Sequence, residues 1–489
     1  MANNDKKKAY VPYWKPHTVD NTFYNSITPH LVESLEELDK LLNNTYKDSK
    51  YMAFDIETSG LDPTANDAEI IGYSFSFDQK DGYYVSINHA LSDDVNLGIE
   101  GLQLIYDKML QVKVFVANLQ FDFPYMEYEG KRFNKDWDMS KVAYYDIFVG
   151  LYLADSNIKF PSLKKSALFW LGFSTDTFSD TLGDAYNFKY VSARDAYIYG
   201  ATDALMTYAL APISLKFYKE AGLSGKIDNE FIYPLAYMLK GTILHDVPLV
   251  KQWSQELQER RDFLEAEIYK KVGLPFNIGS PKQLSDALLS IGFDTGVRTK
   301  SGYMKAGMEE LEKQNKITPH PIVALLVEFK KIEKTLSTYI KPFIEQANKC
   351  NSDRWRYCYH LYSAPTCRLS GGKDGKNSYY AGVNAHAITK PHSKNWYVHD
   401  WHEGDTRQEG DIVVLDWRFS LKEPSDYIIE GFDPQYNLRS IFKPNENNYW
   451  VSIDFSAEEL RLIANYSKSK VWTNTFLEGG DLHENMAMI

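Results

Sequence analysis

The chain has 489 residues, of which 44% are apolar, and a formal net charge of −12. Because this length exceeds one ordinary folding core, we expect two to four globular domains. The acidic total argues against a general binder of polyanions but leaves room for local basic surfaces. The three cysteines lack the paired spacing of a zinc site, which favours reduced thiols, and no apolar run is long enough to predict a membrane span.

Up to about residue 225 the chain alternates apolar strands with helical patterns, which is typical of an α/β domain. The opening stretch, residues 1–27, is polar, basic and interrupted by proline, and this composition predicts a flexible arm. Within the α/β domain, strands are predicted at residues 51–55, 70–77, 83–87 and 112–119.

The predicted strand within "YMAFDIET" carries two carboxylates on one face. Asp55 and Glu57 lie two positions apart, and side chains of a strand alternate between its faces, so both acids point the same way. Phe54 and Ile56 occupy the opposite face. Taken alone, an acid pair of this kind is also typical of a solvated sheet surface.

Two further polar pairs follow at helical spacing. Asn118 and Asp122 lie four apart in "NLQFD", directly after a predicted strand, and Tyr199 and Asp203 repeat that spacing in "YGATD". Each pair alone is common on solvated helices. Three polar pairs in one domain, in this order, favour a shared site.

The stretches "FDIET", "NLQFD" and "YGATD" resemble the three motifs of the DnaQ-like 3′–5′ exonucleases of the DEDDy type, over residues 28–225. The resemblance implies an RNase H-like mixed sheet with helices. It also implies that four acids bind two Mg²⁺ or Mn²⁺ ions, namely Asp55, Glu57, Asp122 and Asp203. Tyr199 would orient the attacking water, and Asn118 would contact the substrate. A following stretch, "PSLKKSALFWLG", resembles a helix of the same family whose leucines and tryptophan we expect in the core.

Between residues 228 and 355 the pattern changes to long amphipathic helices. After residue 355 the chain becomes strand-like and rich in turns, with the glycine-containing loop "RLSGGKDGKNS". The helical stretches are "FIYPLAYMLKGTILHD" at 231–246, "SQELQERRDFLEAEIYKKV" at 254–272, and "HPIVALLVEFKKIEKTLSTYIKPFIEQANK" at 320–349.

A second acid, Asp454, ends a predicted strand in "YWVSIDFSAEELRLIANYSK", just before a predicted helix. An aspartate in this position is also typical of a helix cap. The stretch nevertheless resembles motif A of the family A DNA polymerases, the bacterial polymerase I class. Three more stretches match that family in the same order: "FNIGSPKQLSDALL" and "KTLSTYIKP" resemble its thumb, and "TCRLS" resembles its Thr-Gly-Arg-Leu-Ser segment.

This second resemblance implies a helical thumb with connecting helices at 228–355 and a partial α+β palm at 356–489. Asp454, with the carbonyl of Phe455, would bind Mg²⁺ at the polymerase site, and Glu459 would select deoxynucleotides. Arg368 would reach the minor groove beside the primer terminus. Phe455 replaces a tyrosine of the family, and Cys367 replaces a glycine. Residues 391–432 are expected to form an insertion, with a predicted hairpin strand, that contacts a partner chain. The alternatives are that it contacts DNA or that it has no binding role.

In the family a fingers helix and a second palm aspartate follow motif A, and the residues after 468 match neither. We therefore expect the N-terminal subunit of a split DNA-directed DNA polymerase in DNA replication, which carries the proofreading exonuclease and half of the polymerase site. A C-terminal polymerase chain would complete the hetero-oligomer. The expected ligands are primer-template DNA and single-stranded 3′ ends, with dNTP only in the assembled enzyme. The expected location is the cytoplasm of a phage-infected bacterium, with no membrane.

Two alternatives remain from the sequence. One is a stand-alone 3′–5′ exonuclease whose C-terminal half has decayed into a DNA-binding module. The other is a full polymerase that was truncated, or interrupted by an intein or intron.

Overall fold

The computed structural model describes residues 19, 22–157, 162–372, 384–388, 438–449, 457–480 and 482. The chain divides into two compact units, Met1–Phe442 and Lys443–Ile489. Most of the predicted arm, the whole 391–432 insertion, and Asp454 with Phe455 lie outside the described residues. Within these described ranges, no helix combines the length and apolarity that a membrane span requires.

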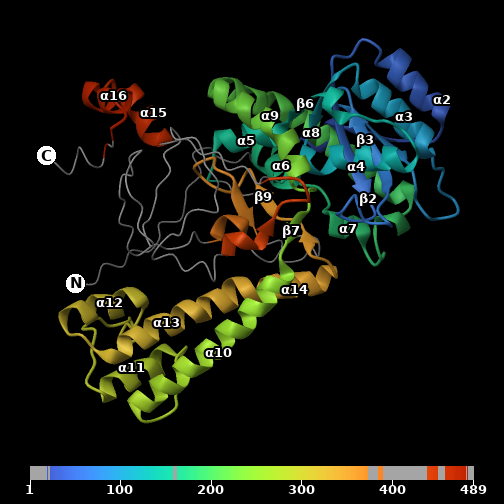
Figure 1. The fold of residues 1–489 in the computed structure, drawn as a ribbon. Coiled ribbons are helices and arrows are strands. Elements are labelled where there is room, and N and C mark those ends of the chain that lie inside the picture. The colour runs from blue at the N-terminus through green and yellow to red at the C-terminus, as the bar shows by residue number, and fades with distance from the viewer. Residues whose placement is uncertain are drawn as a thin grey trace. The chain divides into compact units, whose positions relative to one another are not determined.

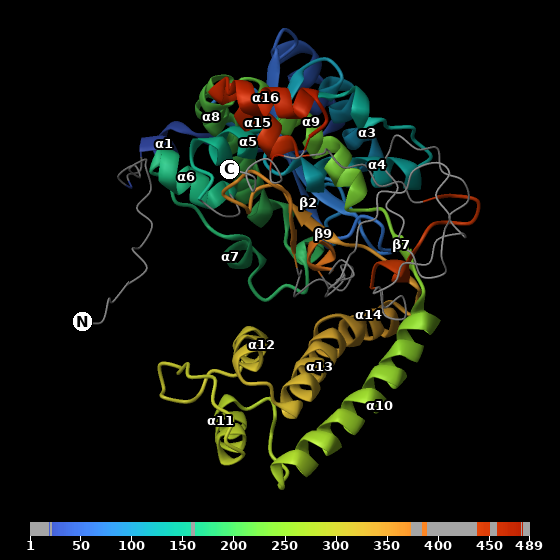
Figure 2. The same cartoon turned by 60° about the vertical axis from the view of Figure 1, so that its left-hand side comes forward.

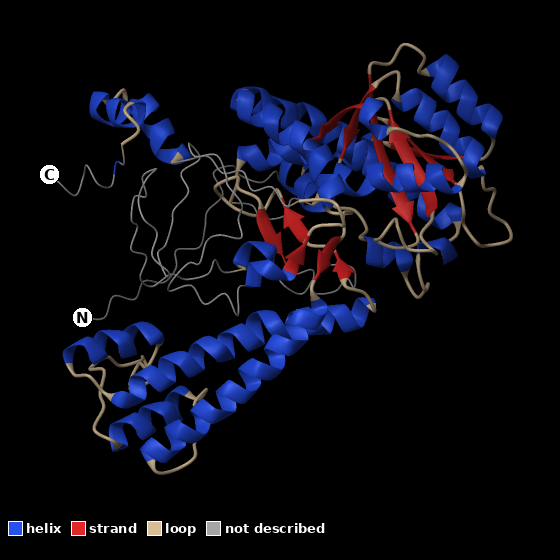
Figure 3. Ribbon diagram, in the orientation of Figure 1, coloured by secondary structure: helices blue, strands red, loops and turns tan. Residues whose placement is uncertain are grey.

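A mixed six-stranded sheet organises the N-terminal part of the first unit (Figures 1 and 3). Its strands are β1 Thr28–Val32, β2 Tyr51–Thr58, β3 Ile70–Ser76, β4 Asp81–Ser86, β5 Lys113–Val116 and β6 Ala143–Asp146. They lie in the order β1-β4-β3-β2-β5-β6. Strand β2 pairs antiparallel with β3 and parallel with β5, so it lies in the interior of the sheet. The predicted mixed sheet with helices is confirmed.

Helices cover both faces of this sheet (Figure 1). The long helix α8, Ala193–Ala221, packs along β1 to β5 on one face. Helices α3, Gly98–Met109, and α4, Leu119–Arg132, supply side chains to the core on the other face. The remaining helices of this part are α1 Thr22–Ser26, α2 Leu35–Lys40, α5 Ile147–Ala154, α6 Leu163–Leu171, α7 Phe178–Leu182 and α9 Leu223–Met238.

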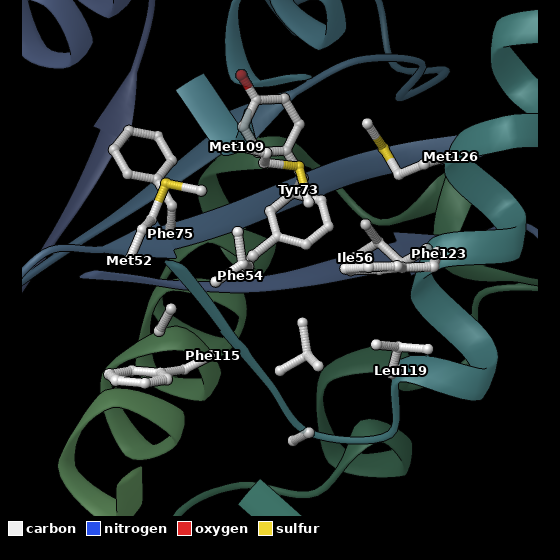
Figure 4. Packing of buried hydrophobic residues seen from close by; sticks show 14 of the residues in the cluster. Met52, Phe54, Ile56, Tyr73, Phe75, Met109, Phe115, Leu119, Phe123 and Met126 are labelled. Carbon is white, nitrogen blue, oxygen red and sulfur yellow. The ribbon is translucent and has the colours of Figure 1, made fainter. Parts of the chain in front are cut away.

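The side chains of β2 alternate between the two faces of the sheet, with apolar residues on one face and the two acids on the other. Phe54 and Ile56 are buried on the α3 and α4 side, where Figure 4 shows them among Tyr73, Met109 and Phe123. The residues between and after them, Asp55 and Glu57, therefore face α8. Burial of the aromatic and aliphatic side chains holds β2 in register, because a shift of one residue would bring the two acids into the core.

Two elements differ from the sequence-based prediction. The helix predicted at 231–246 ends at Met238, and Ile243–His245 forms strand β7. Gly241 follows the helix, and a β-branched pair, Thr242 and Ile243, follows the glycine; this order favours a strand over continued helix. Helix α9 packs against α4 and α5, so it adds to the core of the sheet domain. At the N-terminus, the end of the predicted arm forms α1.

The helical part that follows β7 has its own core (Figure 2). Its long helix, α10, packs against α13 and α14, and a π-helical turn at Leu336–Ile340 joins the latter two. The bounds are α10 Val247–Val272, α11 Pro281–Ser290, α12 Met308–Ile317, α13 Pro321–Thr335 and α14 Lys341–Cys350. The helices predicted at 254–272 and 320–349 are thus confirmed.

Short strands close this helical part. Strand β7 pairs antiparallel with β8, Arg354–Trp355, so that Ile243 lies opposite Trp355. The backbone N–H of His245 donates to the carbonyl of Asp353 at 2.9 Å. Strand β11, Phe442–Lys443, lies on the other side of β7, and β9, Cys358–His360, pairs with β10, Ser370–Gly372.

The second unit contains two described helices, α15 at Glu458–Ser467 and α16 at Lys470–Leu477, which pack on each other. The guanidinium of Arg461 lies 4.5 Å from the centre of the Phe476 ring. Ala464 is buried, whereas Leu462 and Ile463 are each 50% exposed. The helix predicted after the motif A strand is confirmed.

Candidate metal centre

Three carboxylates meet on the face of the sheet that α8 covers. Asp55 and Glu57 lie on β2, and Asp203 lies on α8. One oxygen atom of each lies within 4.8 Å of the corresponding atoms of the other two. Carboxylate oxygens this close together suit a hard divalent cation such as Mg²⁺ or Mn²⁺. The structure therefore brings together three of the four acids singled out by the sequence.

The fourth acid, Asp122, lies in the first turn of α4. Its side chain is buried, and its Oδ2 atom accepts no hydrogen bond from any residue that the structure describes. Burial first, and then the charges of Asp55, Asp146 and Glu57, raise the pKa of Asp122 well above its usual range. A buried carboxylate oxygen without a partner is costly unless a ligand completes it. Asp122 thus fits a cation site, and we call the four acids the carboxylate cluster.

Burial and mutual repulsion govern ionisation within the cluster. Burial, followed by the charge of Asp203, raises the pKa of Asp55 well above its usual range. Burial, followed by the charges of Asp55 and Asp203, does the same to the pKa of Glu57. Because like charges without a counter-ion oppose ionisation, bound cations would favour the charged carboxylates. The donor set and its charge therefore fit divalent metals.

The start of α4 is fixed by a residue that the sequence analysis did not identify, Asp146. Its carboxylate accepts the backbone N–H of Leu119 at 2.8 Å and that of Phe148 at 2.9 Å, so it caps both α4 and α5. Asn118 precedes α4 in the left-handed region, at φ 82°, which asparagine tolerates better than most residues. Burial raises the pKa of Asp146 to about 6, against the effect of its backbone hydrogen bonds. An aspartate between a strand and a helix is a capping signal that sequence reasoning can use.

Tyr199 lies one helical turn before Asp203 on α8, as the spacing predicted. Burial, then the charges of Asp203, Glu57 and Asp55, raise the pKa of the Tyr199 phenol far above its usual range. The phenol is therefore protonated at neutral pH and can donate a hydrogen bond, but it cannot act as a base there.

A lysine that the sequence analysis did not identify also lies beside the carboxylate cluster. Lys164, in the first turn of α6, forms an ion pair with Asp203 through its Nζ atom. The same nitrogen lies 4.2 Å from the centre of the Tyr199 ring. The prediction for the stretch "PSLKKSALFWLG" concerns its leucines and tryptophan, not Lys164. The available signal was a lysine in the first turn of a helix, where basic residues are unfavourable.

A pocket of about 390 Å³ opens beside the cluster. Asp55, Asn118 and Asp203 line it on one side. Residues 360–362, which follow β9 far along the chain, line it on the other side. The volume lies in the range of small-molecule sites. The pocket is thus assembled from both the sheet domain and the part of the chain that follows the long helices.

The second group of predicted site residues is less completely described. Arg368 lies just before β10 and is exposed. Cys367, beside it, adopts φ 57°, a conformation in which glycine has no steric cost, and this agrees with its taking the place of a glycine in the family pattern. Glu459 lies in the first turn of α15, in the other unit, and is exposed. Asp454 and Phe455 lie outside the described residues.

Comparison with known proteins agrees with both resemblances. Residues 29–215 match the family described as 3′–5′ exonuclease, and residues 247–373 match DNA polymerase family A. DNA polymerase I of Borreliella burgdorferi is 26% identical over 481 residues, which cover 96% of this chain and 45% of the relative. DNA polymerase I of Pseudomonas aeruginosa is 26% identical over 340 residues, 66% of this chain and 36% of the relative. The chain thus spans less than half the length of these relatives.

A solved structure has the same fold over most of the chain. It is the POL domain of Pol1 from M. smegmatis in complex with DNA primer-template and dNTP. The TM-score is 0.63 at 16% identity, and the match covers 93% of this chain and 66% of the other. The chain is therefore homologous to bacterial DNA polymerase I, with a segment that matches the 3′–5′ exonuclease family and a second that matches part of DNA polymerase family A.

Proposed function

We propose that this chain is a metal-dependent 3′–5′ exonuclease acting on DNA, and that residues 28–225 form its exonuclease domain. The observation that carries the proposal is that one carboxylate oxygen each of Asp55, Glu57 and Asp203 lie within 4.8 Å of one another, together with the unpartnered Oδ2 atom of the buried Asp122. When bound, two Mg²⁺ or Mn²⁺ ions would supply an acidified water and neutralise charge on the phosphate.

The residues of the chain would hold and orient the reactants. The four acids of the carboxylate cluster bind the cations, and the protonated Tyr199 donates a hydrogen bond that orients the attacking water. Asn118 contacts the terminal nucleotide from the pocket wall. Because a pocket of this kind takes a nucleotide only after it has left the base stack, a frayed 3′ end is the preferred substrate.

The exonuclease is tested with a 5′-labelled primer whose 3′ terminus is mismatched to its template. Shortening should require Mg²⁺, be faster than on a paired terminus, and fall by at least about a thousandfold in Asp55→Ala/Glu57→Ala, since both cation ligands are lost. A matched control removes two exposed acids of the same domain, Asp93→Ala/Glu100→Ala. Cleavage by the first variant at the rate of the control would contradict the assignment.

We further propose that the chain contributes half of a DNA polymerase site, which a separate chain completes. In this proposal residues 228–355 form the thumb and 356–489 part of the palm. Asp454, with the Phe455 carbonyl, binds Mg²⁺, while Arg368 and Glu459 contact the primer terminus and the incoming sugar. Support comes from the match of residues 247–373 to the polymerase family. Apolar side chains also lie exposed on α15 and α16, among them Leu462, Val471 and Leu477, which suits a hydrophobic partner interface.

The partner is tested by recovering the tagged chain from the cells that make it and identifying stoichiometric companions by mass spectrometry. A second polypeptide that confers primer extension with dNTP would support the split polymerase. Recovery of this chain alone would favour the stand-alone exonuclease, and recovery of a longer chain would favour a truncated or intein-interrupted polymerase. The expected location is a bacterial cytoplasm, during phage infection if the gene is viral.

A further inference from the structure

Lys164 is a cation placed within a group of acids that the proposed exonuclease must keep for metals. It enters from α6, whose start is fixed by the side chain of Ser162, which accepts the backbone N–H of Lys165. Its side chain is 23% exposed, whereas that of its ion-pair partner, Asp203, is 8% exposed. The lysine thus spans the distance from the surface to the buried acids.

The electrical effect of Lys164 extends beyond its ion pair. Its charge lowers the pKa of Asp203, Asp55 and Glu57 alike, in opposition to burial and repulsion. In the metal-free protein it therefore acts as counter-ion to a cluster of four acids. Asp203, which it contacts, is one of the three acids that each place an oxygen within 4.8 Å of the others.

The charge balance changes when metals and substrate are present. Four ionised carboxylates carry four negative charges, which two divalent cations neutralise completely. An ammonium group beside them is then repelled by the cations, and it no longer has excess negative charge to balance. A phosphodiester brings one negative charge, which one lysine can pair with.

Lys164 can reach such a phosphate without moving its helix. Its neighbours Ser162 and Leu163 line the pocket beside Asp55 and Asp203, so the lysine begins at the pocket wall. Its stem has four flexible carbons, and it rests on the face of Tyr199 through a contact that a small rotation can exchange.

We propose that Lys164 is a mobile counter-ion of the exonuclease site: it occupies the carboxylate cluster in the metal-free protein and pairs with the phosphodiester of the DNA once metals are bound. This inference rests on the proposed exonuclease function. It predicts two opposite effects of one side chain. Lys164 weakens metal binding, because it competes for Asp203, and it favours turnover, because it neutralises charge that grows on the phosphate.

The test uses Lys164→Met, which keeps the length of the side chain and removes its charge. Lys165→Met is the matched control, since Lys165 is exposed and lies in the same helical turn. Binding of Mn²⁺ to the full chain without DNA is measured by titration calorimetry. Lys164→Met should bind Mn²⁺ at least about threefold more tightly than the wild type, since an opposing charge is gone, and Lys165→Met should bind like the wild type.

The second measurement is cleavage of a single-stranded oligonucleotide at saturating Mn²⁺. Here kcat should fall at least about tenfold in Lys164→Met, be partly restored in Lys164→Arg, and be unchanged in Lys165→Met. Circular dichroism checks folding, and Lys164→Gln replaces the methionine variant if that variant does not fold. Unchanged Mn²⁺ affinity, or unchanged kcat, in a folded variant overturns the inference.

Failure of the proposed function gives a different result. If the wild type and Asp55→Ala/Glu57→Ala bind Mn²⁺ identically, the carboxylate cluster is not a metal site and the exonuclease proposal fails. If only the wild type binds Mn²⁺ and Lys164 has no influence on it, the exonuclease proposal stands and the lysine is a structural ion pair.

Discussion

At the carboxylate cluster, burial opposes the ionisation that metal binding requires. Asp55, Glu57, Asp122 and Asp203 all have a raised pKa, with burial as the largest cause. In an unfolded chain the same groups titrate near pH 4. Between that pH and their raised folded pKa the native state holds protons that the unfolded state has released, so stability there depends on pH.

The first prediction is a stability that falls with rising pH when metal is removed. In EDTA the carboxylate cluster binds more protons in the native state than in the unfolded state above about pH 4, so its contribution to the free energy of unfolding decreases as pH rises through the folded pKa values. Mg²⁺ should reduce or reverse this decrease, because it binds the ionised form. Urea unfolding at several pH values measures this free energy. The same pH dependence with and without Mg²⁺ would contradict the prediction. The control is Asp55→Asn/Glu57→Gln, in which stability should depend less on pH.

The sequence showed the cluster itself but not its surroundings. Periodicity alone placed Asp55 and Glu57 on one face of β2, because Phe54 and Ile56 had to be buried. Lys164 could not be assigned in the same way. Its approach to Asp203 depends on how α6 packs on α8, and that packing joins residues 39 apart in sequence.

At the scale of the element, α8 must approach the sheet closely enough to bring Asp203 to β2. Gly200 makes this possible, since a Cβ atom in its place would lie 2.5 Å from the ring of Tyr84 on β4. That ring is buried and its hydroxyl is hydrogen bonded to His89 at 2.8 Å, so it has little freedom to move. The glycine next to Tyr199 therefore sets the distance between the helix and the sheet.

We predict that Gly200→Ala lowers the free energy of unfolding by about 1–2 kcal/mol, the cost of overpacking less the gain in helix propensity. It should also lower exonuclease activity, because Tyr199 and Asp203 move away from Asp55. Urea unfolding and cleavage of a mismatched primer measure the two effects. Gly241→Ala is the control, since its added Cβ would make only ordinary contacts. If the two variants had the same free energy of unfolding and the same activity, α8 would tolerate an added methyl group at Gly200, and the prediction would be wrong.

The elements that sequence missed have a common physical cause. Strands β1 and β6 lie at the two edges of the sheet, are short, and have sequences, "TPHLV" and "AYYD", that lack clear apolar alternation. Their pairing comes from contacts with distant strands, which local pattern does not encode. Helix α9 was extended too far for the converse reason: apolar residues continue past Met238 into β7, and a short apolar run does not distinguish helix from strand.

At the scale of the whole first unit, a buried ion pair connects the exonuclease domain to the chain beyond the long helices. Arg356 binds both carboxylate oxygens of Asp62 at 2.9 Å and the hydroxyl of Thr64 at 2.7 Å. The two charged side chains are 14% and 6% exposed. Asp62 lies in the loop that follows β2, so the contact supports the strand that carries Asp55 and Glu57. A second contact also joins the sheet domain to the chain beyond the long helices: the phenol of Tyr152 donates a hydrogen bond to the carbonyl of Ala364.

We predict that Arg356→Leu lowers the free energy of unfolding by about 3–5 kcal/mol, because it removes the ion-pair partner of the buried Asp62. Asp62→Leu/Arg356→Leu should be less destabilised than Arg356→Leu, since both charges are gone. Urea unfolding of the single and the double variant measures both free energies. A double variant as unstable as the single one would mean that the packing of Arg356, and not its charge, matters.

The antiparallel pairing of β7 with β8 has a consequence for modularity. The helical part begins after His245 and ends before Asp353, and the backbones of these two residues are hydrogen bonded to each other. The residues between them form the helical part, whose core also takes in later residues such as Trp355, Leu438 and Ile441. The far ends of its helices can change in length without any change in the distance between the two ends of the segment. The length of α10 and its partner helices is therefore not fixed by the strands that join them to the rest of the first unit.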